Sequence, residues 1–241
     1  MKNTHHTTMQ IGKWAAGILI AVLVAPAAWS SVLIYTPVGA TASSEYPGRG
    51  AVLAINGSGL AFPTPTSISS IADLPNHNQN GISDMWLDGG TTNATITFDL
   101  GSVKKIDTLY IWNYSETSGG SSIYLNRGAS NVTIYADNSA TPTTFVQSFV
   151  FNKAAPSPIT PTNTGDFNTP VDAYTLASPV TARYFKFDIA SNWGDAGYLG
   201  LSEVRFGDTI PEPTTFVMLG LGGLIVGWRV RAARAKQHRL A

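Results

Sequence analysis

The stretch ITFDLG, residues 96–101, places an apolar side chain at every second position. Ile96, Phe98 and Leu100 alternate with polar residues, which is typical of a β-strand with one face in a core, and Gly101 is expected to end that strand. The same period of two recurs in the segments 109–114, 132–136, 144–151, 185–189 and 204–206. Between the two ends of the chain, no helical period of comparable strength occurs. The pattern therefore predicts an all-β domain.

The composition narrows this prediction to an antiparallel sandwich. Only 12% of the 241 residues are charged, whereas about a quarter of an average soluble domain is charged. The aromatic content of 10% argues against disorder, and the lack of cysteine excludes a disulfide framework and a thiolate metal site. Several short strands joined by turns favour a single jelly-roll domain. The four prolines of residues 153–170 predict a long surface loop.

The charge is distributed unevenly, although the formal net charge is zero. Residues 29–208 contain 14 acidic and 8 basic residues, which leaves this part with a net charge of −6. A protein that binds nucleic acid needs a cationic surface, so that class of partner is disfavoured.

The N-terminus has the organisation of a secretory signal peptide. Two lysines accompany an apolar run at residues 14–25, and Ala25-Pro26-Ala27 supplies the small residues of a cleavage site. We therefore expect residues 1–28 to form a signal peptide helix ahead of an exported domain at residues 29–208. The alternative is an uncleaved N-terminal anchor, for which the apolar run is short.

The C-terminus, residues 209–241, combines three features in a fixed order. Pro211-Glu212-Pro213 comes first, an uncharged apolar run at residues 214–228 follows, and four arginines and a lysine lie in the tail. The run would span only ~22 Å as a helix, so it predicts a marginal transmembrane helix whose ends lie at the interfaces. The basic tail should stay in the cytoplasm, which leaves the preceding domain outside the inner membrane.

This order of features resembles the PEP-CTERM sorting signal of bacterial exported proteins. The resemblance implies that a membrane-embedded exosortase recognises Pro211, Glu212 and Pro213, cuts near them, and releases or transfers the domain. The family usually begins the motif with Val, where this chain has Ile210. The alternative is an ordinary tail anchor with a coincidental Pro-Glu-Pro.

A second resemblance covers roughly residues 41–207. Seven fragments, in this order, are similar to the discoidin or coagulation factor 5/8 C-terminal-type module of the galactose-binding-like jelly-roll superfamily: residues 56–60, 85–87, 97–101, 111–114, 127–128, 182–187 and 200–206. The more specific pieces are FDLG at residue 98 and the pair ARYFKF and GLSEVRF. The resemblance implies an eight-stranded sandwich that binds carbohydrate through loops at one end, commonly without catalysis.

The same resemblance implies a structural Ca²⁺ site. Many members hold this ion between the loop equivalent to residues 56–58 and a Glu equivalent to Glu203, so Asn56, Ser58 and Glu203 are the implied ligands. Ca²⁺ takes about six to eight oxygen ligands. Asn56 stands where the family usually has Asp, which removes one negative charge. The alternative for Glu203, which alternates with apolar residues, is a solvated position on the outer face of a strand.

Sugar recognition needs an aromatic platform and planar polar groups that contact hydroxyls. The loop at residues 193–198 is the best candidate by composition, because its glycines allow sharp turns between two free aromatic residues. Two alternatives remain open: Arg127 could pair with an acidic neighbour, and Trp86 could pack in the core. The candidate ligand-binding residues are His77, Trp86, Tyr114, Arg127, Asn192, Trp193, Asp195 and Tyr198.

Signatures of catalysis are missing from the sequence. It contains no Gly-x-Ser-x-Gly, no His-Glu-x-x-His and no phosphate-binding Gly-x-x-x-x-Gly-Lys-Ser/Thr, and the exported part has one histidine, His77. The sequence does not decide whether two carboxylates are placed for glycoside hydrolysis, because the distance between them depends on the three-dimensional structure. We therefore expect a non-enzymatic surface or matrix protein that binds an extracellular polysaccharide or cell-envelope glycan. The alternatives are a purely structural matrix protein and a secreted hydrolase.

Overall fold

The structure is a computed structural model, and it describes residues 30–79, 83–117, 122–155 and 167–210, together with Gly223, Leu224 and Trp228. The predicted signal peptide, the Pro211-Glu212-Pro213 motif, and nearly all of the predicted transmembrane helix and basic tail lie outside these residues. Within the described part of the chain, no helix has the length and apolar character needed to cross a membrane.

The described residues form an antiparallel all-β fold, as the sequence predicts. Among the described residues of 30–210, the strands are accompanied by short 3-10 helices: η1 (Ala51–Ala54), η2 (Ile71–Asp73) and η4 (Ser122–Arg127). The strands are β1 (Ser31–Tyr35), β2 (Gly39–Ala42), β3 (Ser67–Ile68), β4 (His77–Asn78), β5 (Trp86–Leu87), β6 (Ala94–Asn113), β7 (Asn131–Asp137), β8 (Phe145–Val150), β9 (Phe167–Thr169), β10 (Asp172–Ile189) and β11 (Gly200–Ile210).

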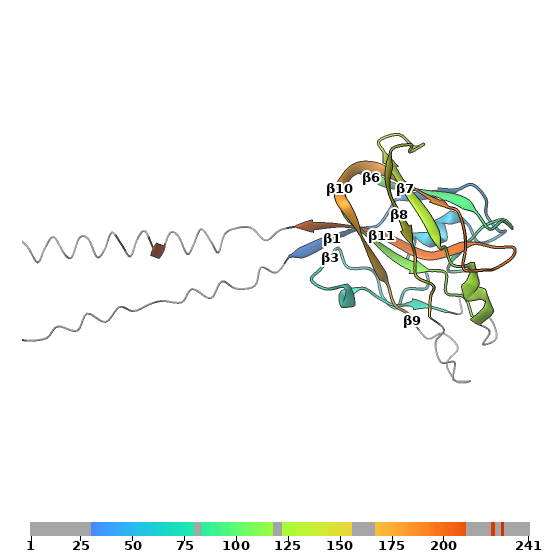
Figure 1. The fold of residues 1–241 in the computed structure, drawn as a ribbon. Coiled ribbons are helices and arrows are strands. Elements are labelled where there is room, and N and C mark those ends of the chain that lie inside the picture. The colour runs from blue at the N-terminus through green and yellow to red at the C-terminus, as the bar shows by residue number, and fades with distance from the viewer. Residues whose placement is uncertain are drawn as a thin grey trace, which may run out of the picture.

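Two layers arise because the long strand β6 bends over itself (Figure 1). The hydrogen-bonded order is β3-β1-β11-β6-β10-β7-β8, with β2 added to β6 and β5 to β11. Phe206 of β11 is paired with Leu109 in the second half of β6. Its ring nevertheless contacts the ring of Phe98, from the first half of β6, at a centroid distance of 5.7 Å. The two halves of β6 therefore face each other across the core of a sandwich.

Gly101 bends β6 without ending it. We expected a strand end at this residue, and that expectation is wrong: β6 continues from Ala94 to Asn113. Gly101 has a φ of +76°, a conformation that favours glycine, and the register with β10 shifts between Ala182 and Tyr184 on the other side. A positive φ turns the chain sharply, so hydrogen bonding resumes in the other layer.

The layer that contains β11 is buried on both faces. Leu109 and Ile111 of β6 belong to the central core, whereas Tyr110 and Trp112 pack on the opposite side with Ile34 and other residues. That outer cluster includes Ile68 and Leu74, so residues of the 55–79 segment cover the outer face. The cover explains why β6 lacks a polar face here. It also buries the polar residues of β11 that point outward.

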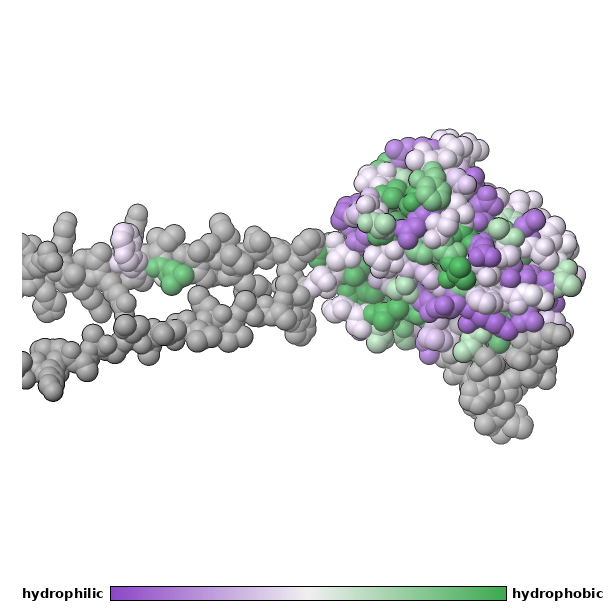
Figure 2. All heavy atoms as spheres, in the orientation of Figure 1, coloured by the Kyte–Doolittle hydropathy of each residue, from purple (hydrophilic) through white to green (hydrophobic). Residues whose placement is uncertain are grey.

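The first and last strands of the domain pair with each other. Ser31 of β1 is opposite Ile210 of β11, so the last strand extends two residues past the boundary predicted at Asp208. Residues 30–210 thus contain every described strand and its partner, and we treat them as one folding unit. β1 begins and β11 ends at one end of the domain, whereas η4 lies at the other end, where β11 begins (Figure 1). The face seen in Figure 2 carries several small apolar patches separated by polar residues.

Candidate functional site

A pocket opens at the end of the sandwich that carries η4. Its volume is about 480 Å³. Five segments build it: the turn after β2, the loop before β5 with β5 itself, the loop that follows β6, η4, and the loop between β10 and β11. The described residues that line it are Tyr46, Pro47, Gly48, Arg49, Ser83, Leu87, Glu116, Tyr124, Arg127 and Tyr198.

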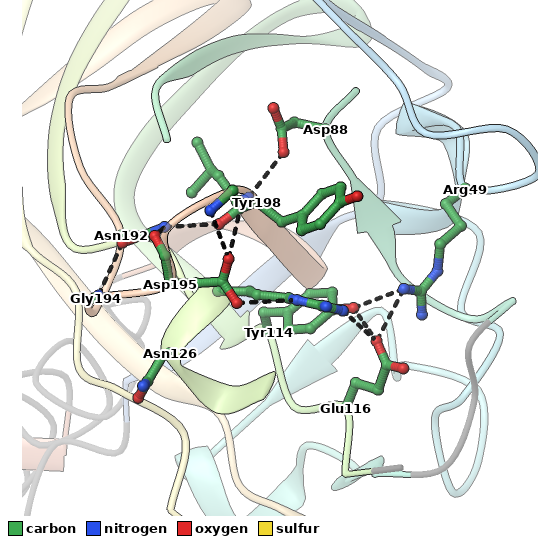
Figure 3. Close-up of polar contacts among 12 residues, drawn as sticks. Arg49, Asp88, Tyr114, Glu116, Asn126, Asn192, Gly194, Asp195 and Tyr198 are labelled. Atoms are coloured by element: carbon green, nitrogen blue, oxygen red, sulfur yellow. Dashed lines mark hydrogen bonds and ion pairs between the residues drawn. The ribbon is translucent and has the colours of Figure 1, made fainter. Parts of the chain in front are cut away.

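Glu116 is the centre of the hydrogen bonds at the base of this pocket (Figure 3). Its Oε2 accepts from Nη1 of Arg49 at 2.9 Å and from Nη1 of Arg127 at 3.3 Å, and the Tyr114 hydroxyl donates to the same oxygen. Arg49 also donates to the Tyr114 oxygen, at 2.7 Å. Burial, reinforced by the neighbouring Glu116 carboxylate, raises the pKa of Tyr114. This phenol therefore stays protonated and acts as a fixed donor.

Arg127 is held rigidly on all sides. The centre of its guanidinium lies 4.2 Å from the ring centroid of Tyr124 and 4.9 Å from that of Tyr198. Its Nε donates to Oδ2 of Asp195 at 3.3 Å, while Nη1 contacts Glu116. Cation–π contact and charge-assisted hydrogen bonds each stabilise one orientation of the planar group. The predicted alternative, in which Arg127 pairs with an acidic neighbour, is confirmed, and the residue also lines the pocket.

The loop between β10 and β11 positions Tyr198. Asp195 Oδ1 accepts from the backbone N–H groups of Gly197 and Tyr198, both at 2.9 Å. Asn192 Nδ2 donates to the carbonyl oxygens of Asp195 and Tyr198 at 2.8 and 2.6 Å. Asp88, from the opposite loop, accepts from the N–H of Leu199 at 2.8 Å. Asn192 and Asp195 thus shape the loop, whereas Tyr198 reaches the pocket.

Gly200 allows the aromatic base of the site to form. A Cβ at this position would lie 2.5 Å from the carbonyl oxygen of Trp86 and 2.5 Å from the ring of Tyr114. Neither neighbour is a flexible side-chain end, so only glycine fits. The close approach lets Tyr114 pack across the start of β11 and present its hydroxyl to Glu116.

The remaining predicted ligand-binding residues lie away from the pocket lining. Trp86 is fully buried in β5 as part of the central core, because β5 pairs with the start of β11. Tyr114 is also fully buried and reaches the site only through its hydroxyl. Trp193 is 38% exposed, but its Nε1 donates to the Phe151 carbonyl at 3.1 Å, outside the pocket. His77 is fully buried in β4.

The burial of His77 can be tested through the pKa of its ring. Its Nδ1 donates to the Asn78 carbonyl at 2.8 Å, and burial lowers the pKa of the ring below its ordinary value of 6.5. As the pH falls, His77 therefore takes up a proton in the unfolded chain before it does so in the folded chain. The stability that comes from burying the neutral ring is present above about pH 6.5 and is lost as the pH falls towards the folded pKa. His77 is the one histidine in residues 30–210. An NMR titration of its Hε1 in that segment should give a midpoint below 6.5, and a midpoint at or above 6.5 would contradict its burial.

Sequence analysis missed several residues of the pocket. Tyr46, Arg49, Glu116 and Tyr124 come from three loops and carry no motif of their own. Tyr46 is 42% exposed, and its ring meets the ring of Tyr198 edge to face at a centroid distance of 5.9 Å. Gly48 and Gly50 are a weak signal for a loop around Tyr46 and Arg49, but nothing in the sequence indicates that this loop lies near Glu116.

The three predicted metal ligands lie near one another, at a second location. Glu203 is completely buried, and its Oε2 accepts from the N–H of Gly57 at 2.9 Å. Its Oε1 contacts Nη1 of Arg205. Asn56 Oδ1 accepts from the N–H and hydroxyl of Ser58 at 2.9 and 2.8 Å. Glu203 is thus not the solvated residue of the alternative interpretation. Binding of Ca²⁺ here stays a prediction.

Comparison with solved structures gives matches to small carbohydrate-binding modules. One is the family 32 module of NanJ from C. perfringens in complex with galactose, at 19% identity, covering 73% of this chain and 99% of that chain, with a TM-score of 0.46. Another is the family 32 module of AlyQ in complex with 4,5-unsaturated mannuronic acid, at 17% identity, 72% and 97% coverage, and a TM-score of 0.43. A third is chitosan-binding module 1 of a chitosanase/glucanase from Paenibacillus sp. IK-5, at 19% identity, 71% and 95% coverage, and a TM-score of 0.44.

Sequence comparisons bear on the C-terminus. A search of curated proteins gives no match to the chain. Residues 209–232 match the family model described as the PEP-CTERM protein-sorting motif. This range contains Pro211-Glu212-Pro213 and the whole of the apolar run that follows. The chain therefore carries a PEP-CTERM sorting motif at its C-terminus.

Proposed function

We propose that this chain is an exported bacterial surface protein whose sandwich binds a glycan, without catalysis, through the pocket around Arg127. The observation that carries the proposal is the rigid guanidinium of Arg127, stacked between Tyr124 and Tyr198 and fixed by Glu116 and Asp195 at the base of an open pocket. Planar polar groups held beside aromatic rings are the parts that sugar recognition needs.

Tyr46 is the proposed platform for the apolar face of a pyranose. It is the most exposed aromatic residue of the pocket lining, and its contact with Tyr198 limits its motion. An aromatic ring that is fixed before binding loses little entropy when the ligand arrives. The sugar would rest on Tyr46 while its hydroxyls contact Arg127 and Glu116.

The charge balance of the site favours a neutral glycan. Arg49 and Arg127 carry two positive charges, and Glu116 and Asp195 carry two negative charges in direct contact with them. A ligand carboxylate would compete with Glu116 for guanidinium groups that are already paired. Neutral hydroxyls, in contrast, can add hydrogen bonds to the existing network without displacing it.

Binding is favoured over glycoside hydrolysis by the carboxylates of the pocket. Among the described residues that line it, Glu116 is the one acid, and three donors converge on its Oε2. Hydrolysis needs two carboxyl groups that face the sugar, about 5 to 10 Å apart. Asp195 does not supply the second, because its oxygens hold Arg127 and the loop backbone.

The position of the pocket suits a protein anchored at its C-terminus. β11 ends at the end of the domain opposite to η4 (Figure 1), and the sorting motif at residues 209–232 overlaps its last two residues and continues beyond it in the sequence. We propose that exosortase acts at this motif while the apolar run lies in the inner membrane, and that the pocket then faces away from the membrane. The domain ends up on the cell surface or in the extracellular matrix.

A glycan array tests the binding proposal with residues 30–210 and the variant Tyr46→Ala. The array should include neutral hexoses, amino sugars and uronic acids. We expect the wild type to retain neutral glycans and the Tyr46→Ala variant to bind at least about tenfold more weakly, which corresponds to 1.4 kcal/mol. The physical reason is loss of the stacking surface.

Phe145→Ala is the matched control. Phe145 is a similarly large aromatic residue, 61% exposed on the edge strand β8, away from the pocket loops. This variant should bind like the wild type. If no glycan is retained by the wild type, the structural matrix protein becomes the better interpretation. Equal loss in both variants would count against a specific site at Tyr46.

A further inference from the structure

An arginine and a glutamate are buried together on β11. Glu203 has no exposed surface and Arg205 is 3% exposed, and Nη1 of Arg205 donates to Oε1 of Glu203 and, at 2.8 Å, to the Val204 carbonyl. The two side chains lie two positions apart on the outer face of β11, beneath the 55–79 segment. A buried charge without a partner is very unfavourable, so each ion depends on the other.

The pair also fixes the turn at residues 56–58. The N–H of Gly57 donates to Oε2 of Glu203 at 2.9 Å. Gly57 has a φ of +76°, which favours glycine, and a Cβ there would lie 3.6 Å from Nη2 of Arg205. The N–H of the turn thus binds the carboxylate, and the space beside its Cα is bounded by the guanidinium of Arg205.

The residues at this place do not fit a calcium ion. Ca²⁺ needs about six to eight oxygen ligands, several of them usually carboxylates. Here Asn56 supplies an amide in place of an acid, and its Oδ1 already accepts two hydrogen bonds from Ser58. Across the described residues, no three His, Cys, Asp or Glu side chains are grouped closely enough to hold a metal. In addition, the guanidinium touches the one carboxylate and would repel a second cation.

We propose that the guanidinium of Arg205 is a built-in cation that holds the 56–58 turn against β11, so that the fold does not require Ca²⁺. A metal ion would balance the Glu203 carboxylate and tie the turn to the strand. Arg205 performs both tasks through a covalently attached charge. This inference does not depend on the glycan-binding proposal, because the pair lies outside the pocket that contains Arg127.

A neighbouring pocket makes the proposal testable by substitution. It has a volume of about 530 Å³ and is lined by Asn56, Gly57 and Arg205, among others. Replacing Arg205 with methionine would remove the guanidinium but keep a long apolar side chain. Adding Asn56→Asp would return a second carboxylate beside Glu203. The double variant should therefore be open to Ca²⁺ from solution, whereas the wild type should not.

The experiment measures the midpoint temperature of unfolding, Tm, of residues 30–210 in EDTA and in millimolar CaCl₂. Burial raises the pKa of Glu203 to about 7, although Arg205 lowers it, so a buffer near pH 8 keeps this carboxylate ionised in the wild type. We expect the wild-type Tm to agree within about 1 °C between the two buffers. Arg205→Met should lower Tm by about 10 °C, and the double variant should regain several degrees in CaCl₂ only.

Arg183→Met is the matched control, because Arg183 pairs with Asp99 at 2.8 Å on the surface. Its Tm should fall by no more than about 2 °C, with or without Ca²⁺. A wild-type Tm that drops by several degrees on chelation would overturn the proposal. So would saturable Ca²⁺ binding to the wild type in calorimetry, a measurement that decides the question even if the Arg205 variants fail to fold.

Discussion

Replacing Arg127 with methionine is expected to weaken glycan binding by residues 30–210 at least about thirtyfold, equivalent to roughly 2 kcal/mol or more. Methionine keeps the long apolar stem between Tyr124 and Tyr198 but has no N–H donors. Glu116 would keep its contacts with Arg49 and Tyr114, and Asp195 would lose Arg127 at Oδ2 but keep two backbone N–H groups at Oδ1. The loss should therefore appear in affinity, measured by calorimetry with the best ligand of the array.

The control for this variant is again Arg183→Met. Arg183 has the same kinds of contact as Arg127: it pairs with Asp99, and its guanidinium lies 4.8 Å from the ring centroid of Tyr184. It lies on β10 and outside the pocket lining, so its removal should leave affinity unchanged. If Arg127→Met binds within a factor of about three of the wild type while folded, the pocket is not the glycan site.

Replacing Pro211-Glu212-Pro213 with three alanines is expected to abolish processing of the full chain in its host. The sorting motif matches residues 209–232, and this range includes the three replaced residues. They follow Ile210, the last residue of β11, which pairs with Ser31. The fold of the domain should therefore survive, and the unprocessed chain should accumulate in the inner membrane. Fractionation and the intact mass of the product measure both effects.

A double alanine variant at Thr214 and Thr215 controls for disturbance of the same region. These residues follow the motif directly, and alanine is apolar enough to continue the run. Processing of this variant should equal that of the wild type. Unchanged mass and localisation in the triple variant would refute recognition of Pro-Glu-Pro by an exosortase.

The strands that alternate clearly were predictable because their signal is local, whereas the short strands β3, β4, β5 and β9 have too few residues to show a period, and β9 lies in a segment predicted as a loop. Alternation in FDLG and in residues 185–189 identifies half-buried strands, and each strand follows from neighbouring residues alone. The bend at Gly101 was not predictable in the same way. A glycine can end a strand or turn it with a positive φ, and which occurs depends on the partner strand β10, which pairs with β6 both before and after Gly101.

Burial of aromatic residues separated good candidates from poor ones. Trp86 and His77 have side chains of the types that bind sugars, but β5 and β4 place them inside the domain. Arg127 and Tyr198 reach the pocket, because they belong to loops that meet at one end of the sandwich. The type of side chain says what a residue can contact, whereas its accessibility depends on elements far away in the chain.

The sequence by itself determined the all-β class and the sorting motif, because a strand period and a linear motif are both contained in contiguous residues. The tertiary structure alone decided the site. Tyr46, Glu116, Arg127 and Tyr198 come from separate loops, and only the closing of the two layers brings them together. The tertiary structure also decided that Glu203 faces Arg205. That contact depends on the 55–79 segment, which lies over β11 and excludes water from both charges.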